Sequence, residues 1–144
     1  MPLKPAIRAG TVVSVFAKTS DGATRSKRYV VMHIADEYIA CIINSQPTEF
    51  ALSKDAIRRC QVAIEAGDYP GMDHSAFVDC SRVFQLDIDD VLAQIDLERW
   101  RHHGAISRPL AERIIGALTV APTIAPRRAA ELCASLRAAF DDVG

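Results

Sequence analysis

The chain has 144 residues, of which 49% are hydrophobic and 24% are charged, a composition typical of one globular domain with its own core and not of a disordered chain. Its formal net charge of −1 at pH 7 does not indicate a general attraction to nucleic acid. No segment resembles a signal peptide or reaches the roughly 20 apolar residues of a membrane span, so we expect a cytoplasmic protein with no membrane partner.

The charges are segregated along the chain. Basic residues dominate positions 1–30 and 99–137, whereas positions 65–98 hold nine acidic residues and a single arginine, Arg82. Such blocks either steer a polyanion to one face of the protein or pair with each other on folding, and mutual pairing is the commoner outcome. The sequence leaves both interpretations open.

The first half of the chain predicts β-structure, because its apolar segments are short and rich in β-branched residues. Strands are expected over residues 11–17, 28–35, 38–44 and 61–65. The polar segment 19–27 predicts a loop between the first two strands. The nearly continuous apolar character of 28–35 and 38–44 indicates central strands buried on both faces, in which His33 would be a hydrogen-bonded sheet residue.

Two shorter features lie between the third strand and residue 75. Residues 53–60 fit a short helix with Ser53 as its N-cap. Residues 66–73 contain two glycines and a proline and predict a loop.

The segment 75–86, SAFVDCSRVFQL, predicts one further strand and carries a cluster of reactive side chains. His74, Ser75, Asp79 and Cys80 lie within seven positions. Because successive side chains of a strand point to opposite faces, Asp79 and Cys80 cannot readily share a metal ion, and His74 and Ser75 cannot readily form a nucleophilic pair. The four cysteines of the chain contain no CxxC pair. We therefore expect free, packed thiols, no metal site and no cofactor.

Asp79 has two interpretations. A carboxylate inside a strand is unfavourable if it is buried without a partner. The commoner explanation is neutralisation by Arg82 or by an arginine of another strand. The functional alternative is an acid–base or phosphate-positioning group beside an arginine.

After residue 86 the apolar residues recur with the 3.6-residue period of a helix. Helices are expected from the cap Asp87 to about Arg101, over 108–118 after the cap Ser107, and from Pro126 to about Phe140. His102 and His103 would close the first helix, and Trp100 would pack it on the sheet. Strands followed by helices indicate an α+β protein, with residues 1–103 as the main unit and 104–144 as a helical extension packed on or beside it.

Four short segments resemble strands of one toxin family. They are RAGTVVSVFA (8–17), SKRYVVM (26–32), ACIINSQ (40–46) and DCSRVFQLD (79–87). In this order they are similar to strands of the PemK/MazF-like toxins, over about residues 8–103. The resemblance implies a small SH3-like antiparallel β-barrel followed here by C-terminal helices. Members of that family are mostly metal-independent endoribonucleases, usually homodimeric, and are inhibited by an antitoxin protein.

The resemblance also implies catalytic residues. Arg28 matches the strand-start arginine that acts on the scissile phosphate, Asp79 matches the carboxylate of the PemK branch, and Ser45 lies where the family has a threonine. Such an arginine stabilises charge on the phosphate, while a carboxylate or second polar group helps to remove the 2′-hydroxyl proton. The enzyme interpretation requires Arg28 and Asp79 to reach one phosphate in a groove, and it fails if they point to different faces.

The same resemblance implies an RNA-binding set. Arg25 and Lys27 lie in the loop before Arg28 and would attract the RNA backbone. Asn44 is the alternative match for the family's threonine, and Arg82 matches an arginine three residues after the carboxylate.

Two functions are therefore expected from the sequence. The first is a toxin-like endoribonuclease or RNA-binding protein of a toxin–antitoxin type system, with single-stranded RNA and an antitoxin as partners. The alternative is a catalytically silent SH3-like barrel that serves as a protein-interaction module. The apolar stripes of the last two helices either pack on the core, the commoner case, or dock a partner or a second copy.

Overall fold

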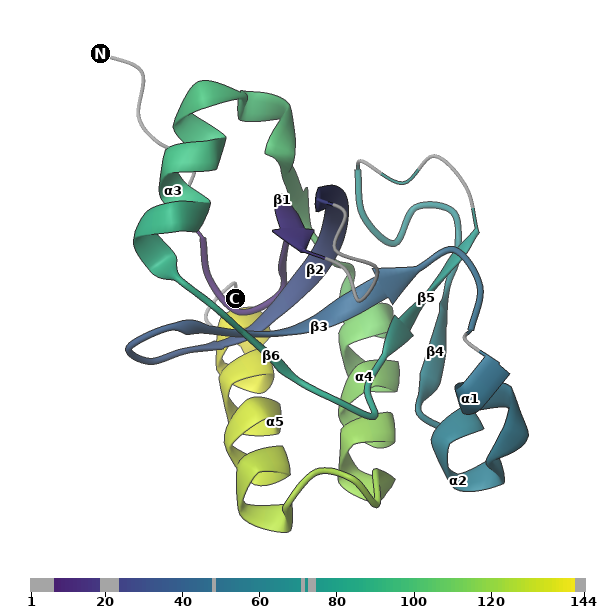
Figure 1. The fold of residues 1–144 in the computed structure, drawn as a ribbon. Helices are drawn as coiled ribbons and strands as arrows, with labels where there is room; N and C mark the ends of the chain where they lie inside the picture. Colours follow the sequence, from purple (N-terminus) through teal and green to yellow (C-terminus); the bar gives the residue numbers. More distant parts are fainter. Residues whose placement is uncertain (1–6, 19–23, 48, 71, 73–74, 142–144) are drawn as a thin grey trace.

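The computed structural model describes residues 7–18, 24–47, 49–70, 72 and 75–141 and shows a mixed α+β protein (Figure 1). In this part of the chain, seven strands form one curled antiparallel half-barrel in the order β4-β5-β3-β2-β1-β7, with β6 also paired to β3. The strands are β1 (Thr11–Lys18), β2 (Thr24–Ile34), β3 (Tyr38–Asn44), β4 (Gln61–Ile64), β5 (Ala76–Asp79), β6 (Phe84–Leu86) and β7 (His102–Ala105). The helices are α1 (Glu49–Ser53), α2 (Asp55–Arg58), α3 (Ile88–Leu97), the 3-10 helix η1 (Arg99–Arg101), α4 (Arg108–Val120) and α5 (Pro126–Asp141).

Both faces of the central strands are buried, as predicted. The cross-strand pair Val12 and Val30 lies in a core that also contains side chains of α4 and α5. The next pair along the same two strands, Val13 and Tyr29, lies in a second core with Val91 of α3. Figure 1 shows α4 and α5 side by side on one side of the sheet. We call these the α4/α5 face and the α3 face.

The two C-terminal helices share a core with the sheet. Leu110 and Ile114 of α4 and Leu132 and Leu136 of α5 are fully buried in the same core as β1, β2 and β3. Strand β7 pairs with β1 and runs across the expected boundary at residue 104. The helices therefore pack on the sheet as part of one hydrophobic core.

The ends of the long helices agree with the sequence. Asp87 caps α3 by accepting a hydrogen bond from the Asp90 amide at 2.8 Å, and Ser107 caps α4 by accepting from the Leu110 amide at 3.2 Å. Pro126 is the first residue of α5, where a missing N–H costs nothing. These three predicted helix starts are confirmed.

The expected helix over 53–60 is replaced by two short helices. Ser53 is the last residue of α1 and not an N-cap. The residue before α2 is Lys54, whose side chain makes no capping hydrogen bond. The prediction of Ser53 as N-cap is therefore wrong.

The expected single strand over 75–86 is two strands. β5 ends at Asp79, whose Oδ1 accepts hydrogen bonds from the Ser81 amide at 2.9 Å and from Ser81 Oγ at 2.5 Å. The hydrogen bond between the Asp79 carboxylate and the backbone amide two residues later forms a side-chain turn, and the chain changes direction there. β5 then pairs with one end of β3, at Ile43 and Asn44, whereas β6 pairs with the other end.

Two other expected boundaries differ. β2 begins at Thr24, so residues 24–27 of the expected loop form strand paired with β1, and residues 19–23 lie outside the described residues. α3 ends at Leu97 and is followed by η1, whose C-cap is His102, so His102 closes the 3-10 helix and, with His103, begins β7. Trp100 is 56% exposed and does not pack α3 on the sheet.

Single polar and reactive side chains of the core behave as expected. His33 Nδ1 is hydrogen-bonded to Ser135 Oγ of α5, and all four cysteines are free and buried. Cys41 and Cys80 are neighbours in the core. A hydrogen bond with Cys41 and burial together raise the pKa of the Cys80 thiol well above its usual value, which keeps it neutral. Among the described residues, none of the helices is both long enough and apolar enough to cross a membrane.

Candidate functional site

Four of the seven predicted site residues line one hollow of about 210 Å³. Lys27 and Arg28 come from β2, and Asn44 and Ser45 come from the end of the neighbouring strand β3. The full lining is Ser26, Lys27, Arg28, Ile43, Asn44, Ser45, Tyr69 and Ala76. We call this hollow the Arg28 pocket.

Arg28 is held in the pocket by its neighbours. Its backbone pairs with Ser14 of β1 and with Ile43 of β3, so the side chains of these residues lie on the α4/α5 face together with that of Arg28. The guanidinium Nη1 donates a hydrogen bond to Tyr69 Oη at 2.9 Å. Because Tyr69 is buried, its hydroxyl holds one terminal nitrogen of the Arg28 guanidinium in place. The arginine as a whole is half-buried.

A histidine that the sequence did not single out lies beside this arginine. His103 Nε2 is hydrogen-bonded to Ser14 Oγ at 2.5 Å, and Ser14 is the cross-strand neighbour of Arg28. The His103 ring also meets the Tyr69 ring edge-on, with centroids 6.4 Å apart. The His103 imidazole and the Arg28 guanidinium therefore both meet Tyr69, and Ser14, which holds the imidazole, lies opposite Arg28 on the adjacent strand.

The loop that carries Tyr69 is anchored by the preceding aspartate. Asp68 accepts hydrogen bonds from the Glu65 amide at 2.7 Å, from Ser107 Oγ at 2.7 Å and from Arg113 Nη2 at 2.8 Å. Burial alone would raise the pKa of the Asp68 carboxyl, but these hydrogen bonds and the Arg113 charge outweigh it and hold that pKa below its usual value. Asp68 is therefore ionised and ties the Tyr69 loop to α4.

Gly104 allows the Tyr69 loop to approach β7. Its φ of +88° is unfavourable for a side chain, and a Cβ there would lie 3.0 Å from Pro70 Cγ. Pro70 follows Tyr69, and Gly104 follows His103, so this close contact brings the two ring-bearing residues together.

Asp79 does not join the Arg28 pocket. Ile43 pairs with Arg28 on one side and with Val78 on the other, so Val78 shares the face of Arg28 and its neighbour Asp79 points to the opposite face. Besides the two hydrogen bonds from Ser81, its carboxylate accepts one from Gln61 Nε2 at 2.9 Å. The requirement that Arg28 and Asp79 reach one phosphate is not met, and a mechanism built on that pair fails.

The remaining predicted residues also lie apart from the pocket. Arg82 is exposed and covers the Phe84 ring, with its Cζ 4.7 Å from the centroid. Burial raises the pKa of Tyr29, a residue of the α3-face core, and the charge of Arg82 offsets part of this rise. Arg25 is an exposed residue of β2 that is not among the lining residues. Ser75 is exposed before β5, and His74 lies outside the described residues.

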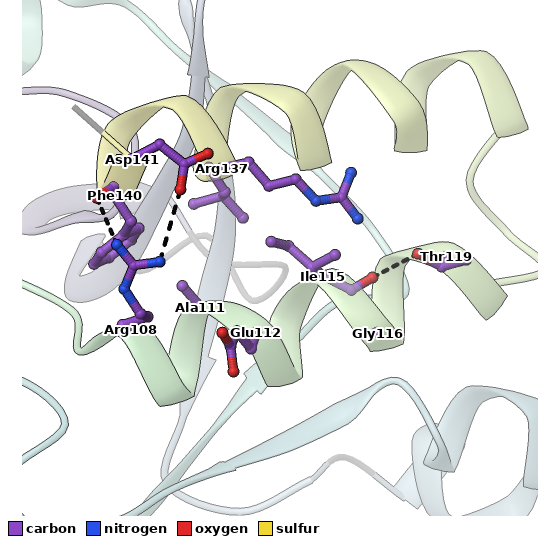
Figure 2. A pocket seen from close by; sticks show the side chains of 10 residues that line it. Arg108, Ala111, Glu112, Ile115, Gly116, Thr119, Arg137, Phe140 and Asp141 are labelled. Atoms are coloured by element: carbon purple, nitrogen blue, oxygen red, sulfur yellow. Dashed lines mark hydrogen bonds and ion pairs between the residues drawn. The ribbon is translucent and has the colours of Figure 1, made fainter. Parts of the chain in front are cut away.

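A second hollow, of about 520 Å³, lies between α4 and α5 (Figure 2). Arg108 crosses it, donating to the Phe140 carbonyl at 2.7 Å and pairing with Asp141 at 3.7 Å. Glu112 and Arg137 also line it, so charges of both signs meet there. This balance suits a polyanion less well than the Arg28 pocket, whose lining includes Lys27 and Arg28.

Within the described part of the chain, no group of three or more His, Cys, Asp or Glu side chains is placed to hold a metal ion. No protein-family model matches the chain, and no curated protein matches it in sequence.

Proposed function

We propose that the Arg28 pocket binds the backbone of single-stranded RNA and that the protein cleaves it there without a metal ion, as a toxin-like endoribonuclease. The observation that carries the proposal is that one buried side chain, Tyr69, accepts a hydrogen bond from the Arg28 guanidinium and also meets the His103 ring edge-on. Lys27 precedes Arg28 on β2 and pairs with Val15 of the α3-face core, so its side chain points to the opposite face, and Arg28 is the charge that meets the phosphate backbone.

The proposed chemistry is transfer of the phosphate to the neighbouring 2′-oxygen. Arg28 donates to the non-bridging phosphate oxygens and stabilises the charge that develops on them. His103, oriented by Ser14, takes the 2′-hydroxyl proton on the nitrogen of its neutral ring that carries no proton. The 2′-oxygen then bonds to phosphorus and the bond to the 5′-oxygen breaks. The departing oxygen takes a proton from the imidazolium or from water, leaving a 2′,3′-cyclic phosphate and a 5′-hydroxyl.

The polar ends of β3 give the pocket further contacts for RNA. Asn44 and Ser45 follow the buried part of the strand, and both line the same hollow as Arg28. Asn44 follows Ile43 on β3, so its side chain points away from Arg28 and only its backbone can serve the pocket. The Ser45 hydroxyl can donate to a phosphate or ribose oxygen, and we assign it to substrate positioning, whereas Asp79 has no role in this mechanism.

We further propose that the fold is the SH3-like barrel of the PemK/MazF-like toxins. The resemblance of four strand segments to that family and the curled antiparallel half-barrel support this assignment. It carries with it the expectations of a homodimer and of an antitoxin partner. Both are tested by measuring the mass of the purified protein in solution and by co-expressing the neighbouring gene.

The test is a cleavage assay on a long single-stranded RNA in EDTA. The wild type is expected to give discrete fragments that end in 2′,3′-cyclic phosphate, whereas Arg28→Ala and His103→Ala give at least about 100-fold less product, the scale of one lost charge-stabilising or acid–base group. Arg82→Ala is the matched control, because it removes an arginine outside the pocket. Intact RNA with folded wild type, or equal loss in all three variants, would contradict the proposal.

A catalytically silent protein-interaction module is the second candidate. The specific observation in its favour is the hollow between α4 and α5, whose lining combines apolar residues with charges of both signs (Figure 2). Folded protein that neither binds nor cleaves RNA would favour this function.

A further inference from the structure

Two exposed aromatic side chains flank a buried arginine close to the Arg28 pocket. Phe16 of β1 is 50% exposed and Trp100 of η1 is 56% exposed, whereas Arg101 between them is 1% exposed. Single exposed aromatic residues are common on protein surfaces. Here, however, both aromatic rings pack on the guanidinium of the same buried arginine. We call these two rings the Phe16/Trp100 platform.

Arg101 fixes the platform from below. Its Cζ lies 3.9 Å from the centroid of the Phe16 ring and 4.5 Å from that of the Trp100 ring, so it contacts one side of each ring. Its Nε donates to Glu98 Oε2 at 2.7 Å, and Nη2 forms an ion pair with the same oxygen at 2.6 Å. The Phe16 amide in turn donates to Gln94 Oε1 at 2.9 Å. These contacts hold both rings in place while about half of each side chain stays open to solvent.

The platform is continuous with the Arg28 pocket. The Trp100 and His103 rings meet at a centroid distance of 6.5 Å. Phe16 pairs across the strands with Ser26, which lines the pocket. Phe16 also lies two residues after Ser14 and so on the same face of β1 as the serine that holds His103.

We propose that the Phe16/Trp100 platform stacks an unpaired base of the RNA strand whose phosphate occupies the Arg28 pocket. This inference rests on the proposed function and adds to it the side chains that contact a base and so select an unpaired strand. Aromatic rings beside a basic groove bind single strands because every base has a flat face to stack, whereas bases inside a duplex are already stacked on each other. The adjacent Arg28 charge favours a nucleic acid over an apolar protein segment as the occupant.

Trp100 is the only tryptophan in the chain, so its fluorescence reports on the platform directly. The ligand is a short 2′-O-methyl RNA strand with a fluorescent label, which cannot be cleaved because the 2′-hydroxyl is blocked. Its anisotropy measures binding, while an unlabelled copy serves for the tryptophan signal. We expect this strand to quench the Trp100 emission. A matched strand with abasic positions should bind more weakly and leave the emission unchanged.

Variants separate stacking from charge. Phe16→Ala and Trp100→Ala should each weaken binding of the intact strand about 5- to 150-fold, the range for loss of one stacked base, with little effect on the abasic strand. Trp100→Phe should recover most of the affinity. Val120→Ala, which removes another exposed apolar side chain, is the control and should leave the affinity unchanged. Since Trp100 covers a buried arginine, Trp100→Phe and the abasic strand keep the test valid even if the alanine variant does not fold.

The two proposals fail in different ways. If the intact strand binds with unchanged Trp100 emission and the platform variants bind as tightly as the wild type, the platform inference is wrong and RNA binding at Arg28 stands. If folded wild type binds neither strand, the proposed function itself is wrong, and the platform inference fails with it.

Discussion

Tyr69 controls how Arg28 is presented to the pocket. Its hydroxyl accepts a hydrogen bond from Arg28 Nη1, and the ring that carries it is buried. A hydrogen bond to a charged group contributes about 1.5–3 kcal/mol. In the free protein, part of that energy keeps the guanidinium in one orientation, which an arginine acting on a phosphate needs.

The first prediction concerns this hydroxyl. Tyr69→Phe should lower kcat for RNA cleavage about 10- to 100-fold, because the guanidinium loses the partner that orients it. The protein should melt within a few degrees of the wild type, since the ring itself is kept. Tyr38→Phe removes the hydroxyl of another buried tyrosine, in the α3-face core, and should leave cleavage unchanged. Equal cleavage by the Tyr69 variant and the wild type would contradict this role.

A second prediction at the residue scale concerns Asp79. Its carboxylate is 7% exposed and accepts three hydrogen bonds, two from Ser81 and one from Gln61. Asp79→Ala leaves these donors without their acceptor, and we expect a loss of about 1–3 kcal/mol in the free energy of unfolding, measured by urea denaturation. Variant protein that is still folded should cleave RNA at the wild-type rate. A variant of normal stability that no longer cleaves would show that Asp79 acts in catalysis after all.

At the scale of elements, the site depends on the close approach of the Tyr69 loop to β7. Gly104→Ala should destabilise the protein more than Gly67→Ala does, by at least about 1 kcal/mol. Both glycines have a positive φ near +87°, but a Cβ at Gly67 has nothing within 4 Å, whereas one at Gly104 would press on Pro70. The difference between their melting temperatures isolates the cost of that contact. Equal melting temperatures for the two variants would mean that the Tyr69 loop moves away from β7 at no cost in stability.

Local sequence patterns account for most of the elements. The β-branched residues of 11–17, the apolar run at 38–44 and the caps Asp87 and Ser107 all act within a few residues, so the strands and helix starts they predict are confirmed. The alternation over 75–86 does not predict the break between β5 and β6, although Asp79 and Ser81 carry a recognisable signal of a side-chain turn. The alternating apolar residues on either side of this turn favour one continuous strand instead.

The candidate site was only partly predictable, because its central contacts are between distant segments. Lys27, Arg28, Asn44 and Ser45 were selected from a family resemblance, and the structure brings all four to one pocket. The hydrogen bond between Ser14 and His103 spans 89 positions. The residues near His103 contain no pattern that predicts the pairing of β7 with β1. A helical period that ran on past Leu97 favoured a helix end there instead.

At the scale of the whole molecule, the C-terminal helices are expected to fold together with the sheet. Leu136 of α5 is fully buried in the core that it shares with β1, β2 and β3. Leu136→Ala should cost about 2–5 kcal/mol in the free energy of unfolding. Helical circular dichroism and Trp100 fluorescence should be lost in a single transition, since Trp100 precedes β7. Separate transitions, with the tryptophan signal unchanged by the substitution, would show that the helices form an independent unit.

The measurement that tests the central claim most directly is an NMR titration of the isotope-labelled 15.7 kDa chain with a non-cleavable single-stranded RNA. We predict that the amide signals of Lys27, Arg28, Asn44 and Ser45 shift, together with that of His103. Signals of the Asp79–Ser81 turn and of the hollow between α4 and α5 should stay in place. Shifts confined to either of these two regions, or no shifts with saturating RNA, would contradict the assignment of the Arg28 pocket as an RNA-binding site.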